Sequence, residues 1–367
     1  MQALILAGGE GTRLRPLTST IPKPVVPLVD RPFITYMIEW LRAHGVDDVI
    51  LACGFMAADV RSVIGDGTSL GVRVRYIEEP RPLGTGGALK YAKELLAERF
   101  LMLNGDILTD IDLGAQLSQH ERTGARATLA LAAVDNPSAY GLVRCGSDHA
   151  VNAFVEKPGP DEADTNLISA GAYVLERDIL DEMAPAGTNI SIERDVFPLL
   201  VGRGLYGYAA AGYWLDIGTP DRYLEGTFDI LSGRVRTELT ERLEREGSVL
   251  IESADVEAGV IAPALVQADC TLAPDATVGP EAILASGVSV GERTRVRRSV
   301  LLEGASVGAG CVVSDSIVGP GAQIGDECQI GPGVVLGEGA MIGSGNVLDP
   351  GARIFPGAVL GEEAITP

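Results

Sequence analysis

The residues best suited to chemistry stand near the start of the chain, where a short apolar strand runs into a loop rich in glycine and basic residues. Gly8, Gly9 and Gly11 lack a Cβ, so the backbone can turn tightly and bring several N–H donors close to an anion. Arg13 and Lys23 add positive charge to the same loop, and prolines on both sides of Lys23 fix the backbone and prevent a helix. We interpret this stretch as a phosphate-binding loop.

Two common phosphate-binding loops do not fit this spacing. A dinucleotide fingerprint G-x-G-x-x-G that starts at Gly9 needs glycine where Leu14 stands. A Walker A loop that starts at Gly8 needs Gly-Lys where the chain has Arg13 and Leu14. A tight turn without a ligand is the alternative for the glycines alone, but the neighbouring cations favour a phosphate ligand.

A second candidate site follows the apolar strand predicted at residues 100–103, which ends in Asn104, Gly105 and Asp106. Ligands of open α/β sheets bind outside the carboxyl ends of the strands, so Asp106 is well placed to hold a metal ion. An aspartate in an ordinary turn is the alternative. Upstream, the G-T-G-G run from Gly84 opens a predicted helix, whose N-terminus could hold a phosphate or the polar edge of a base, or could be a capped helix start.

The segments L-A-G-G-E-G-T-R-L-R-P-L-T and P-K-P resemble the signature of the sugar-nucleotide pyrophosphorylases. These enzymes join a sugar 1-phosphate to a nucleoside triphosphate and release pyrophosphate. The resemblance covers nearly the whole chain, and in layout it is closest to mannose-1-phosphate guanylyltransferases with a C-terminal β-helix. It implies a Rossmann-like nucleotidyltransferase domain with Arg13, Lys23 and Lys157 as catalytic residues.

The resemblance also assigns binding residues. It implies Mg²⁺ as cofactor, held by Asp106 and Asp216. Nucleotide contacts are implied at Leu6, Ala7, Gly8, Gly9, Gly11, Thr12, Arg13, Lys23, Gly84, Thr85, Gly86, Asn104, Gly105 and Asp106. Sugar-phosphate contacts are implied at Gly141, Glu156, Lys157, Ser169, Ala170 and Gly171. The family has Asn where this chain has Ser169, so the sugar contact there departs from the family pattern.

The substrates that the resemblance implies are GTP and mannose 1-phosphate, with in-line attack on the α-phosphate and GDP-mannose as product. The G-T-G-G loop, the S-I-E-R-D-V-F-P segment at residues 191–198 and the β-helix are similar to those of guanylyltransferases. Another NDP-sugar product (GDP-heptose, GDP-glucose, dTDP-glucose or UDP-glucose) is an alternative. Two further alternatives are a non-catalytic regulatory paralogue and a structural assembly subunit.

Composition excludes several other classes of protein. The chain of 367 residues is 46% hydrophobic and 22% charged, which is ordinary for a globular protein, and its net charge of −21 argues against non-specific nucleic-acid binding. No apolar run is long enough for a membrane span and no signal peptide is recognisable, so we expect a cytoplasmic protein that does not bind membranes. The five scattered cysteines, without a C-x-x-C spacing, predict neither a disulfide framework nor a zinc site. We also expect a homo-oligomer.

The elements that must position these residues form an α/β pattern with a mostly parallel sheet. We expect helices at residues 32–44 and 87–96, strands at 49–53 and 72–77, and a central strand at 100–103. Thr219 and Pro220 should cap and begin a helix that extends to about residue 231. The predicted domains are residues 1–232 for catalysis, a charged linker or surface helix at 233–258, and a left-handed β-helix at 259–367.

The β-helix is predicted from aliphatic residues at steps of six. One series runs from Val260 to Leu302, and after one phase slip a second runs from Val312 to Leu360. This hexapeptide repeat is typical of a parallel β-helix in which each unit points one aliphatic inward. Acyltransferases with such a fold usually need a histidine base, and all three histidines precede the repeat, so we do not expect acyl transfer.

Overall fold

The computed structural model describes residues 1–159, 164–256 and 259–366. The end of the predicted linker (residues 257–258) and the last residue of the predicted β-helix (residue 367) lie outside this description. The chain forms two compact units, one of Met1–Gly9 with Ile34–Trp214 and one of Glu10–Phe33 with Leu215–Pro367. The glycine-rich loop therefore begins in the first unit and continues in the second.

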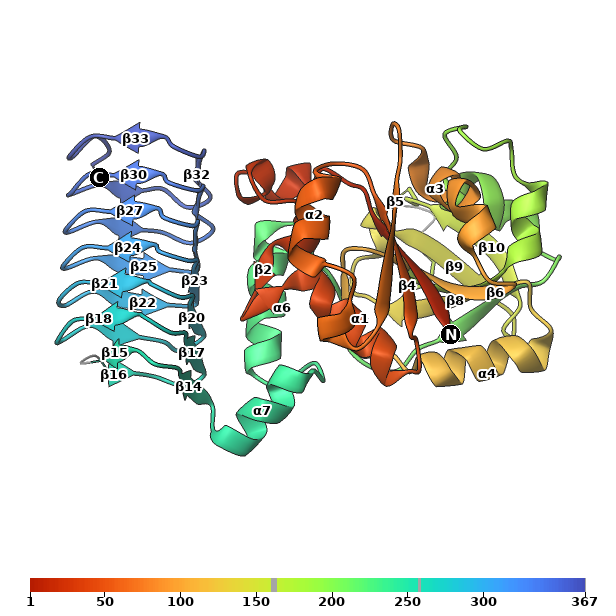
Figure 1. Ribbon diagram of the computed structural model, residues 1–367, viewed down its shortest axis with the longest axis horizontal. Coiled ribbons are helices and arrows are strands. Elements are labelled where there is room, and N and C mark those ends of the chain that lie inside the picture. The colour runs from red at the N-terminus through yellow and green to blue at the C-terminus, as the bar shows by residue number, and fades with distance from the viewer. Residues whose placement is uncertain (160–163, 257–258, 367) are drawn as a thin grey trace. The chain divides into compact units, whose positions relative to one another are not determined.

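A nine-stranded sheet forms the centre of the first unit, in the order β10-β9-β11-β6-β1-β4-β5, with β8 paired to β11 and β12 paired to β8 (Figure 1). Its strands are β1 (Gln2–Ala7), β4 (Asp48–Cys53), β5 (Arg73–Glu78), β6 (Arg99–Asn104), β8 (Ala127–Ala133), β9 (Gly141–Cys145), β10 (Val151–Glu156), β11 (Leu167–Glu176) and β12 (Leu205–Ala209). Strands β6, β1, β4 and β5 run parallel, whereas β11 is antiparallel to β6. The apolar strand predicted to be central is β6, at the middle of this order.

The helices of the sheet-containing part agree with the pattern of apolar residues. They are α1 (Phe33–Ala43), α2 (Ala57–Ile64), α3 (Gly84–Ala92), α4 (Leu113–Thr123) and α5 (Phe197–Leu200). The helix predicted at 32–44 is confirmed as α1. Helix α3 begins earlier than residue 87 because the amides of Gly86 and Gly87 donate to Ile190 O at 2.9 and 3.2 Å, which satisfies donors of its first turn.

The second unit contains three parallel sheets of short strands stacked coil upon coil, the β-helix that the repeat predicts (Figure 1, cyan to blue). One sheet contains β14 (Val249–Ile251), β17 (Ala264–Val266), β20 (Ala282–Leu284), β23 (Ser299–Leu301), β26 (Ile317–Val318), β29 (Val335–Leu336) and β32 (Arg353–Ile354). The next contains β15 (Asp255–Val256), β18 (Thr271–Leu272), β21 (Ser289–Val290), β24 (Ser306–Val307), β27 (Gln323–Ile324), β30 (Met341–Ile342) and β33 (Val359–Leu360). The third contains β16 (Gly259–Val260), β19 (Thr277–Val278), β22 (Arg295–Arg297), β25 (Val312–Ser314), β28 (Gln329–Ile330) and β31 (Val347–Leu348).

The single phase slip expected in the repeat is in fact two shortened corners. Val266 pairs with Leu284, but Leu284 pairs with Leu301 and Leu301 with Val318, so two successive coils are each one residue shorter than the coil before them. The interior aliphatics in this region are Leu301, Val307 and Val313, and neither Leu302 nor Val312 belongs to the interior core. The prediction that Leu302 and Val312 point inward was therefore wrong, because a step of six was extended across corners of five.

The β-helix buries one of its outer faces as well as its interior. Five outward residues of the sheet that begins with β14 are at most 1% exposed: Leu265, Ile283, Val300, Ile317 and Val335. Within the same unit, Gln267 Nε2 donates to Asp30 O at 3.4 Å and Arg353 Nη1 donates to Arg15 O at 3.1 Å. The loop that carries Arg13 and Lys23 is thus held by side chains of the β-helix.

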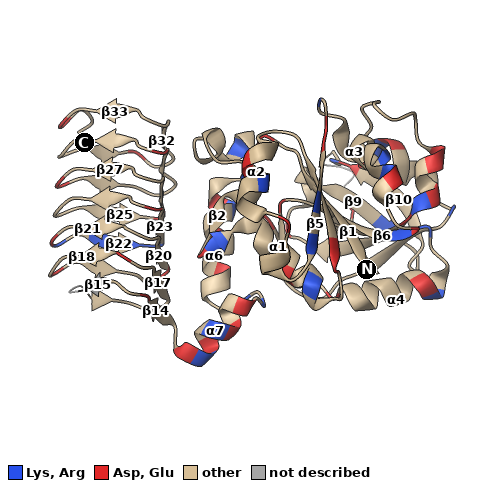
Figure 2. Ribbon diagram, in the orientation of Figure 1, with Lys and Arg blue, Asp and Glu red and all other residues tan. Residues whose placement is uncertain are grey.

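The remaining elements of the second unit include two helices, α6 (Pro220–Leu231) and α7 (Glu238–Glu246), and the short strands β2 (Pro27–Leu28) and β3 (Arg31–Pro32). Thr219 caps α6 and Pro220 begins it, as predicted, with Thr219 Oγ1 accepting the Arg222 amide at 3.4 Å. The charged stretch after residue 233 contains α7, whose surface is largely acidic and basic (Figure 2). Across the described part of the chain, every helix is too short or too polar to cross a membrane.

Candidate active site

The end of β1 and the end of β6 meet at the predicted nucleotide-binding residues. Leu6 pairs with Asn104, and the Gly105 amide donates to Leu6 O at 3.0 Å. A Cβ on Gly105 would collide with Leu6 O, so only glycine allows this approach. Asp106 follows directly, and the neighbouring strand ends bring Leu6, Asn104 and Asp106 to one edge of the sheet, as the parallel arrangement predicts.

Gly9 has no packing explanation in the described structure. A Cβ built on it would meet nothing within 4 Å, and its φ lies outside the left-handed region. By contrast, a Cβ on Gly8 would lie 3.3 Å from Glu79 Oε1 and from the Gly54 amide nitrogen. The nucleotide contact expected at Gly9 stays a prediction.

The glycines of the G-T-G-G run, in contrast, are explained by packing. A Cβ on Gly84 would lie 2.5 Å from Ile190 O, and one on Gly87 would lie 2.7 Å from Thr188 O. Gly84 also has a φ of 74°, in the left-handed region. Since the Gly86 and Gly87 amides already donate to Ile190 O, these two donors serve the fold. A phosphate or base would have to use other groups of this loop.

Glu79 connects the two glycine-rich segments and was missed by sequence reasoning. Its Oε2 accepts the Leu83 amide at 2.9 Å, next to Gly84, while its Oε1 lies on the side of Gly8. Burial raises the pKa of this carboxyl, and the Leu83 hydrogen bond partly offsets the rise. The sequence signal was an acidic residue directly after β5, at the carboxyl end of a parallel strand.

The predicted sugar-phosphate residues, which come from three separate stretches, converge on β9, β10 and β11. Gly141 pairs with Glu156 across the β9–β10 ladder, and a Cβ on Gly141 would lie 2.9 Å from Glu156 Oε2. Gly171 has a φ of 73°, and a Cβ on it would lie 3.0 Å from Asn104 Nδ2. This contact joins the predicted sugar-binding residues to the predicted nucleotide-binding residues.

An aromatic pair lies beside this group. Trp214 Nε1 donates to Ala170 O at 2.7 Å, and the rings of Trp214 and Tyr140 meet edge to face with centroids 5.4 Å apart. Tyr140 O accepts the Lys157 amide at 3.1 Å. Lys157 itself is exposed and has a φ of 53°, an uncommon conformation for a residue with a side chain that is often found at functional sites.

The same region collects acidic groups around a buried tyrosine. Ser169 Oγ and Tyr173 Oη are 3.0 Å apart. Burial raises the pKa of Glu156, and the charge of Glu193 raises it further. Burial also raises the pKa of Tyr173, with added contributions from Glu193, Glu156 and Asp106. Glu193, Glu156 and Asp106 are thus close enough to the Tyr173 hydroxyl for their charges to disfavour its ionisation.

Asn104 carries an unmet hydrogen-bonding group in this region. Its Oδ1 is buried and accepts no hydrogen bond within the part of the chain that the structure describes. Buried acceptors are rarely left without a partner, so a bound water or a ligand hydroxyl would be favourable here.

In the second unit, the structure brings Arg13 to the motif that contains Asp216. A Cβ on Gly218 would lie 2.5 Å from Arg13 Nη2, so the guanidinium lies directly against the backbone two residues after Asp216. Gly11 has a φ of 63°, and a Cβ on it would lie 3.0 Å from Lys23 Cβ. These close approaches place Gly11, Arg13, Lys23 and the segment from Asp216 to Gly218 within one unit.

Possible metal ligands are divided between the units, with Asp106 in the first and Asp216 in the second. Within the described ranges, no group of three or more His, Cys, Asp or Glu side chains is arranged to hold a metal ion. All five cysteines are free thiols, and the sequence predicted no disulfide framework. The meeting of Asp106 and Asp216 stays a prediction.

Comparison with known proteins defines the class. A family model described as nucleotidyl transferase matches residues 2–233, and one described as the GMPPB C-terminal domain matches residues 260–356. A putative glucose-1-phosphate thymidylyltransferase from Bacillus anthracis has the same fold, with a TM-score of 0.59, 22% identity and coverage of 66% of this chain and 99% of that one. The chain therefore belongs to the nucleotidyl transferase family.

Named relatives narrow this assignment. A mannose-1-phosphate guanylyltransferase from Mycobacterium tuberculosis is 37% identical, covering 71% of this chain and 74% of the relative. Mannose-1-phosphate guanylyltransferase 1 from Arabidopsis thaliana is 36% identical, covering 81% of each chain. The crystal structure of HddC from Yersinia pseudotuberculosis is 29% identical with a TM-score of 0.54, covering 62% of this chain and 99% of that one. With such relatives over most of its length, the chain is an enzyme of the mannose-1-phosphate guanylyltransferase type.

Proposed function

We propose that this chain forms GDP-mannose and pyrophosphate from GTP and mannose 1-phosphate. The observation that carries the proposal is the convergence of Gly141, Glu156 and Gly171 beside Asn104, in a chain whose named relatives are mannose-1-phosphate guanylyltransferases. This arrangement offers a sugar phosphate a place next to the residues expected to bind the nucleotide.

In the proposed reaction, a phosphate oxygen of mannose 1-phosphate attacks the α-phosphorus of GTP. The bond between the α-phosphorus and the oxygen that bridges to the β-phosphate breaks, and pyrophosphate leaves with that electron pair. Such a transfer depends on alignment and charge neutralisation rather than on a protein nucleophile. Arg13 and Lys23 bind the triphosphate, and Lys157 binds the sugar phosphate.

Asp106 and Asp216 are the proposed ligands of Mg²⁺. A hard cation prefers carboxylate oxygen, and Mg²⁺ is usually held by one or two carboxylates together with substrate phosphates. A two-aspartate donor set fits that chemistry without a larger cluster. When bound, the ion would neutralise negative charge on the phosphates.

Glu79 is the proposed acceptor for guanine. The N1–H and the 2-amino group of guanine both donate, and an ionised carboxylate accepts through two oxygens. Adenine has no donor pair in that position, so a carboxylate there would be left without partners. The position of Glu79 between Gly8 and Leu83 and its half-buried state support this role. A crystal structure of HddC in complex with GMP-PN supports nucleotide binding by a relative with this fold.

Selectivity for the sugar should be weaker than selectivity for the base. Mannose and glucose differ in the orientation of one hydroxyl, and Ser169, which is paired with Tyr173, is a short side chain. GDP-glucose and GDP-heptose are therefore the competing products.

Pyrophosphate release from a matrix of triphosphates (GTP, ATP, UTP, dTTP) and sugar phosphates tests the proposal. We expect the highest kcat/KM for GTP with mannose 1-phosphate, and almost none in Asp106→Asn, which serves as the control for contaminating activity. A higher kcat/KM for another triphosphate would refute the base assignment. No turnover with any pair, in a protein that still binds GDP-mannose, would instead support the regulatory paralogue. The homo-oligomeric state and the cytoplasmic location stay predictions.

A further inference from the structure

The two shortened corners of the β-helix fall on the same edge of successive coils. They connect β22 to β23 at Arg298 and β25 to β26 at Asp315, and both residues have a left-handed φ, 46° and 48°. The loss of one residue at each corner sets these coils apart from the next one, whose corner contains Pro332 and Gly333. The shortened edge is therefore a local feature of the middle coils rather than a general property of the repeat.

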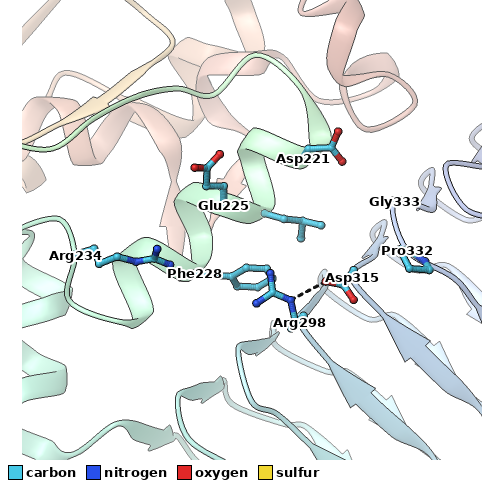
Figure 3. A pocket seen from close by; sticks show the side chains of 9 residues that line it. Asp221, Glu225, Phe228, Arg234, Arg298, Asp315, Pro332 and Gly333 are labelled. Carbon is cyan, nitrogen blue, oxygen red and sulfur yellow. Dashed lines mark hydrogen bonds and ion pairs between the residues drawn. The ribbon is translucent and has the colours of Figure 1, made fainter. Parts of the chain in front are cut away.

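A pocket of about 500 Å³ lies between this edge and α6, within the second unit. Leu224, Phe228 and Pro332 give it apolar walls, and Arg298 and Asp315 line the β-helix side (Figure 3). Most residues of α6 are buried, so the pocket is a local gap on one side of the helix, and a group that bridges it can fix the position of that side.

Arg298 bridges the pocket. Its guanidinium carbon lies 4.9 Å from the centre of the Phe228 ring, a cation–π arrangement. Its Nε donates to Asp315 Oδ1 at 2.7 Å, and its Nη1 is paired with Glu281 Oε2. The guanidinium is therefore fixed from the coils on both sides while its flat face meets Phe228 (Figure 3).

Helix α6 connects this contact to the proposed active site. The helix is capped by Thr219, three residues after Asp216, and Phe228 lies two turns further along. One turn after the cap, Tyr223 Oη donates to Pro27 O at 2.5 Å, at the start of β2 and directly after the loop that contains Arg13 and Lys23. A shift of α6 would therefore move both the proposed metal ligand and the proposed triphosphate loop.

We infer that Arg298 is a positioning residue for nucleotidyl transfer, acting through Phe228 and α6 to fix Asp216 and the basic loop. The inference rests on the proposed function. Arg298 acts by fixing geometry, because partly exposed ion pairs add little to the free energy of unfolding. A misplaced residue that binds phosphate or metal, by contrast, lowers the rate steeply.

Arg298→Ala, Arg298→Lys and Phe228→Leu, together with the double variant Arg298→Ala/Phe228→Leu, test this inference. We expect Arg298→Ala to lower kcat on the order of tenfold and to raise the Mg²⁺ concentration for half-maximal rate, with an unfolding temperature close to that of the wild type. The kcat of Arg298→Lys should fall between those of the wild type and Arg298→Ala. An ammonium group keeps the charge but cannot stack flat on Phe228 while it bonds both carboxylates. The double variant should be no worse than the more impaired single variant, because both act through one contact.

The matched control is Arg293→Ala. Arg293 also has a left-handed φ, 57°, also sits on a β-helix corner and is paired with Glu292 at 3.3 Å, but it does not line the pocket. It should behave as wild type in every assay.

Amide hydrogen exchange over residues 216–231 gives a readout that does not depend on the reaction. Exchange should be faster in Arg298→Ala than in wild type and in Arg293→Ala. Unchanged exchange in this helix, or faster exchange with unchanged kcat and Mg²⁺ dependence, would overturn the inference. If the protein proved to catalyse another reaction, the exchange comparison would still decide whether Arg298 holds α6.

Discussion

At the scale of single residues, the candidate site combines glycines that the fold requires with polar groups that the fold does not explain. Gly105 allows Leu6 O to approach too closely for any Cβ, and Gly171 has a left-handed φ, so the structure itself requires both glycines although they lie in the candidate site. Lys157, exposed and held in a left-handed conformation, has no such explanation. Glu79 and Asn104 are polar groups at strand ends, where a ligand of an α/β sheet is expected.

Glu79 gives the first prediction at this scale. If guanine donates two hydrogen bonds to this carboxyl, only the ionised form is active. Because burial raises its pKa, kcat/KM for GTP should fall as pH decreases through a range above that of an exposed glutamate. Glu79→Gln should lower kcat/KM for GTP on the order of tenfold or more, and it should remove this acid limb.

Glu78→Gln is the control for Glu79, since Glu78 is the adjacent carboxylate and is exposed. It should keep both the rate with GTP and the pH profile of the wild type. A Glu79→Gln enzyme that retains the full preference for GTP over ATP would exclude Glu79 as the base acceptor. Steady-state rates from pH 5 to 8 with both triphosphates provide the measurement.

At the scale of elements, the sequence predicted what depends on local pattern. The helix at 32–44, the central strand β6 and the cap at Thr219 follow from periodicity and capping chemistry, and the structure confirms them. The start of α3 could not be predicted, because the acceptor of its Gly86 and Gly87 amides is Ile190, about a hundred residues further along the chain. Glu79 was missed although its bond to Leu83 is local, because the side chain of a single acidic residue after a strand has many possible partners. The shortened corners were missed because Leu302 and Val312 happen to continue the aliphatic series, and only strand pairing distinguishes them from Leu301 and Val313.

The two glycine-rich segments give a prediction at this scale, because packing explains the glycine at position 87 but not the one at position 9. Gly87→Ala would place a Cβ 2.7 Å from Thr188 O and 2.8 Å from Leu83 Cβ, so we expect it to cost about 1–3 kcal/mol of the free energy of unfolding. Gly9→Ala meets nothing within 4 Å and should leave stability nearly unchanged.

The effects on activity should be the reverse of those on stability, with Gly9→Ala impaired and Gly87→Ala not. Gly9→Ala should raise the KM for GTP, because the methyl group occupies space that a phosphate would use, whereas Gly87→Ala should keep its KM where it remains folded. Urea unfolding and initial rates at varied GTP measure both effects. Wild-type kinetics in Gly9→Ala would show that the loop at position 9 does not approach the nucleotide.

At the scale of the whole molecule, each of the two compact units is built from two separate segments of the chain. The segment Glu10–Phe33, which lies in the catalytic part of the sequence, belongs to the same unit as the β-helix. The buried outer face that includes Leu265 and Ile283 explains why the repeat is more than an appendage, since an apolar outer face must be covered. The β-helix thus supports the loop from which Arg13 and Lys23 are expected to bind the triphosphate.

The prediction at this scale concerns Arg353, near the C-terminal end of the β-helix, which donates to Arg15 O at 3.1 Å across nearly the full length of the sequence. A hydrogen bond from a charged donor at an exposed position contributes about 1 kcal/mol, which corresponds to about a fivefold effect on binding. Arg353→Ala should therefore raise the KM for GTP about two- to fivefold. The KM for mannose 1-phosphate should stay unchanged, because Lys157, directly after β10, belongs to the other unit. Arg297→Ala, which removes an exposed arginine from a middle coil, is the control and should match the wild type. Equal changes in both KM values would show that Arg353 acts on general stability instead of on the loop. A change in oligomeric size, measured by light scattering, would show that it acts on assembly.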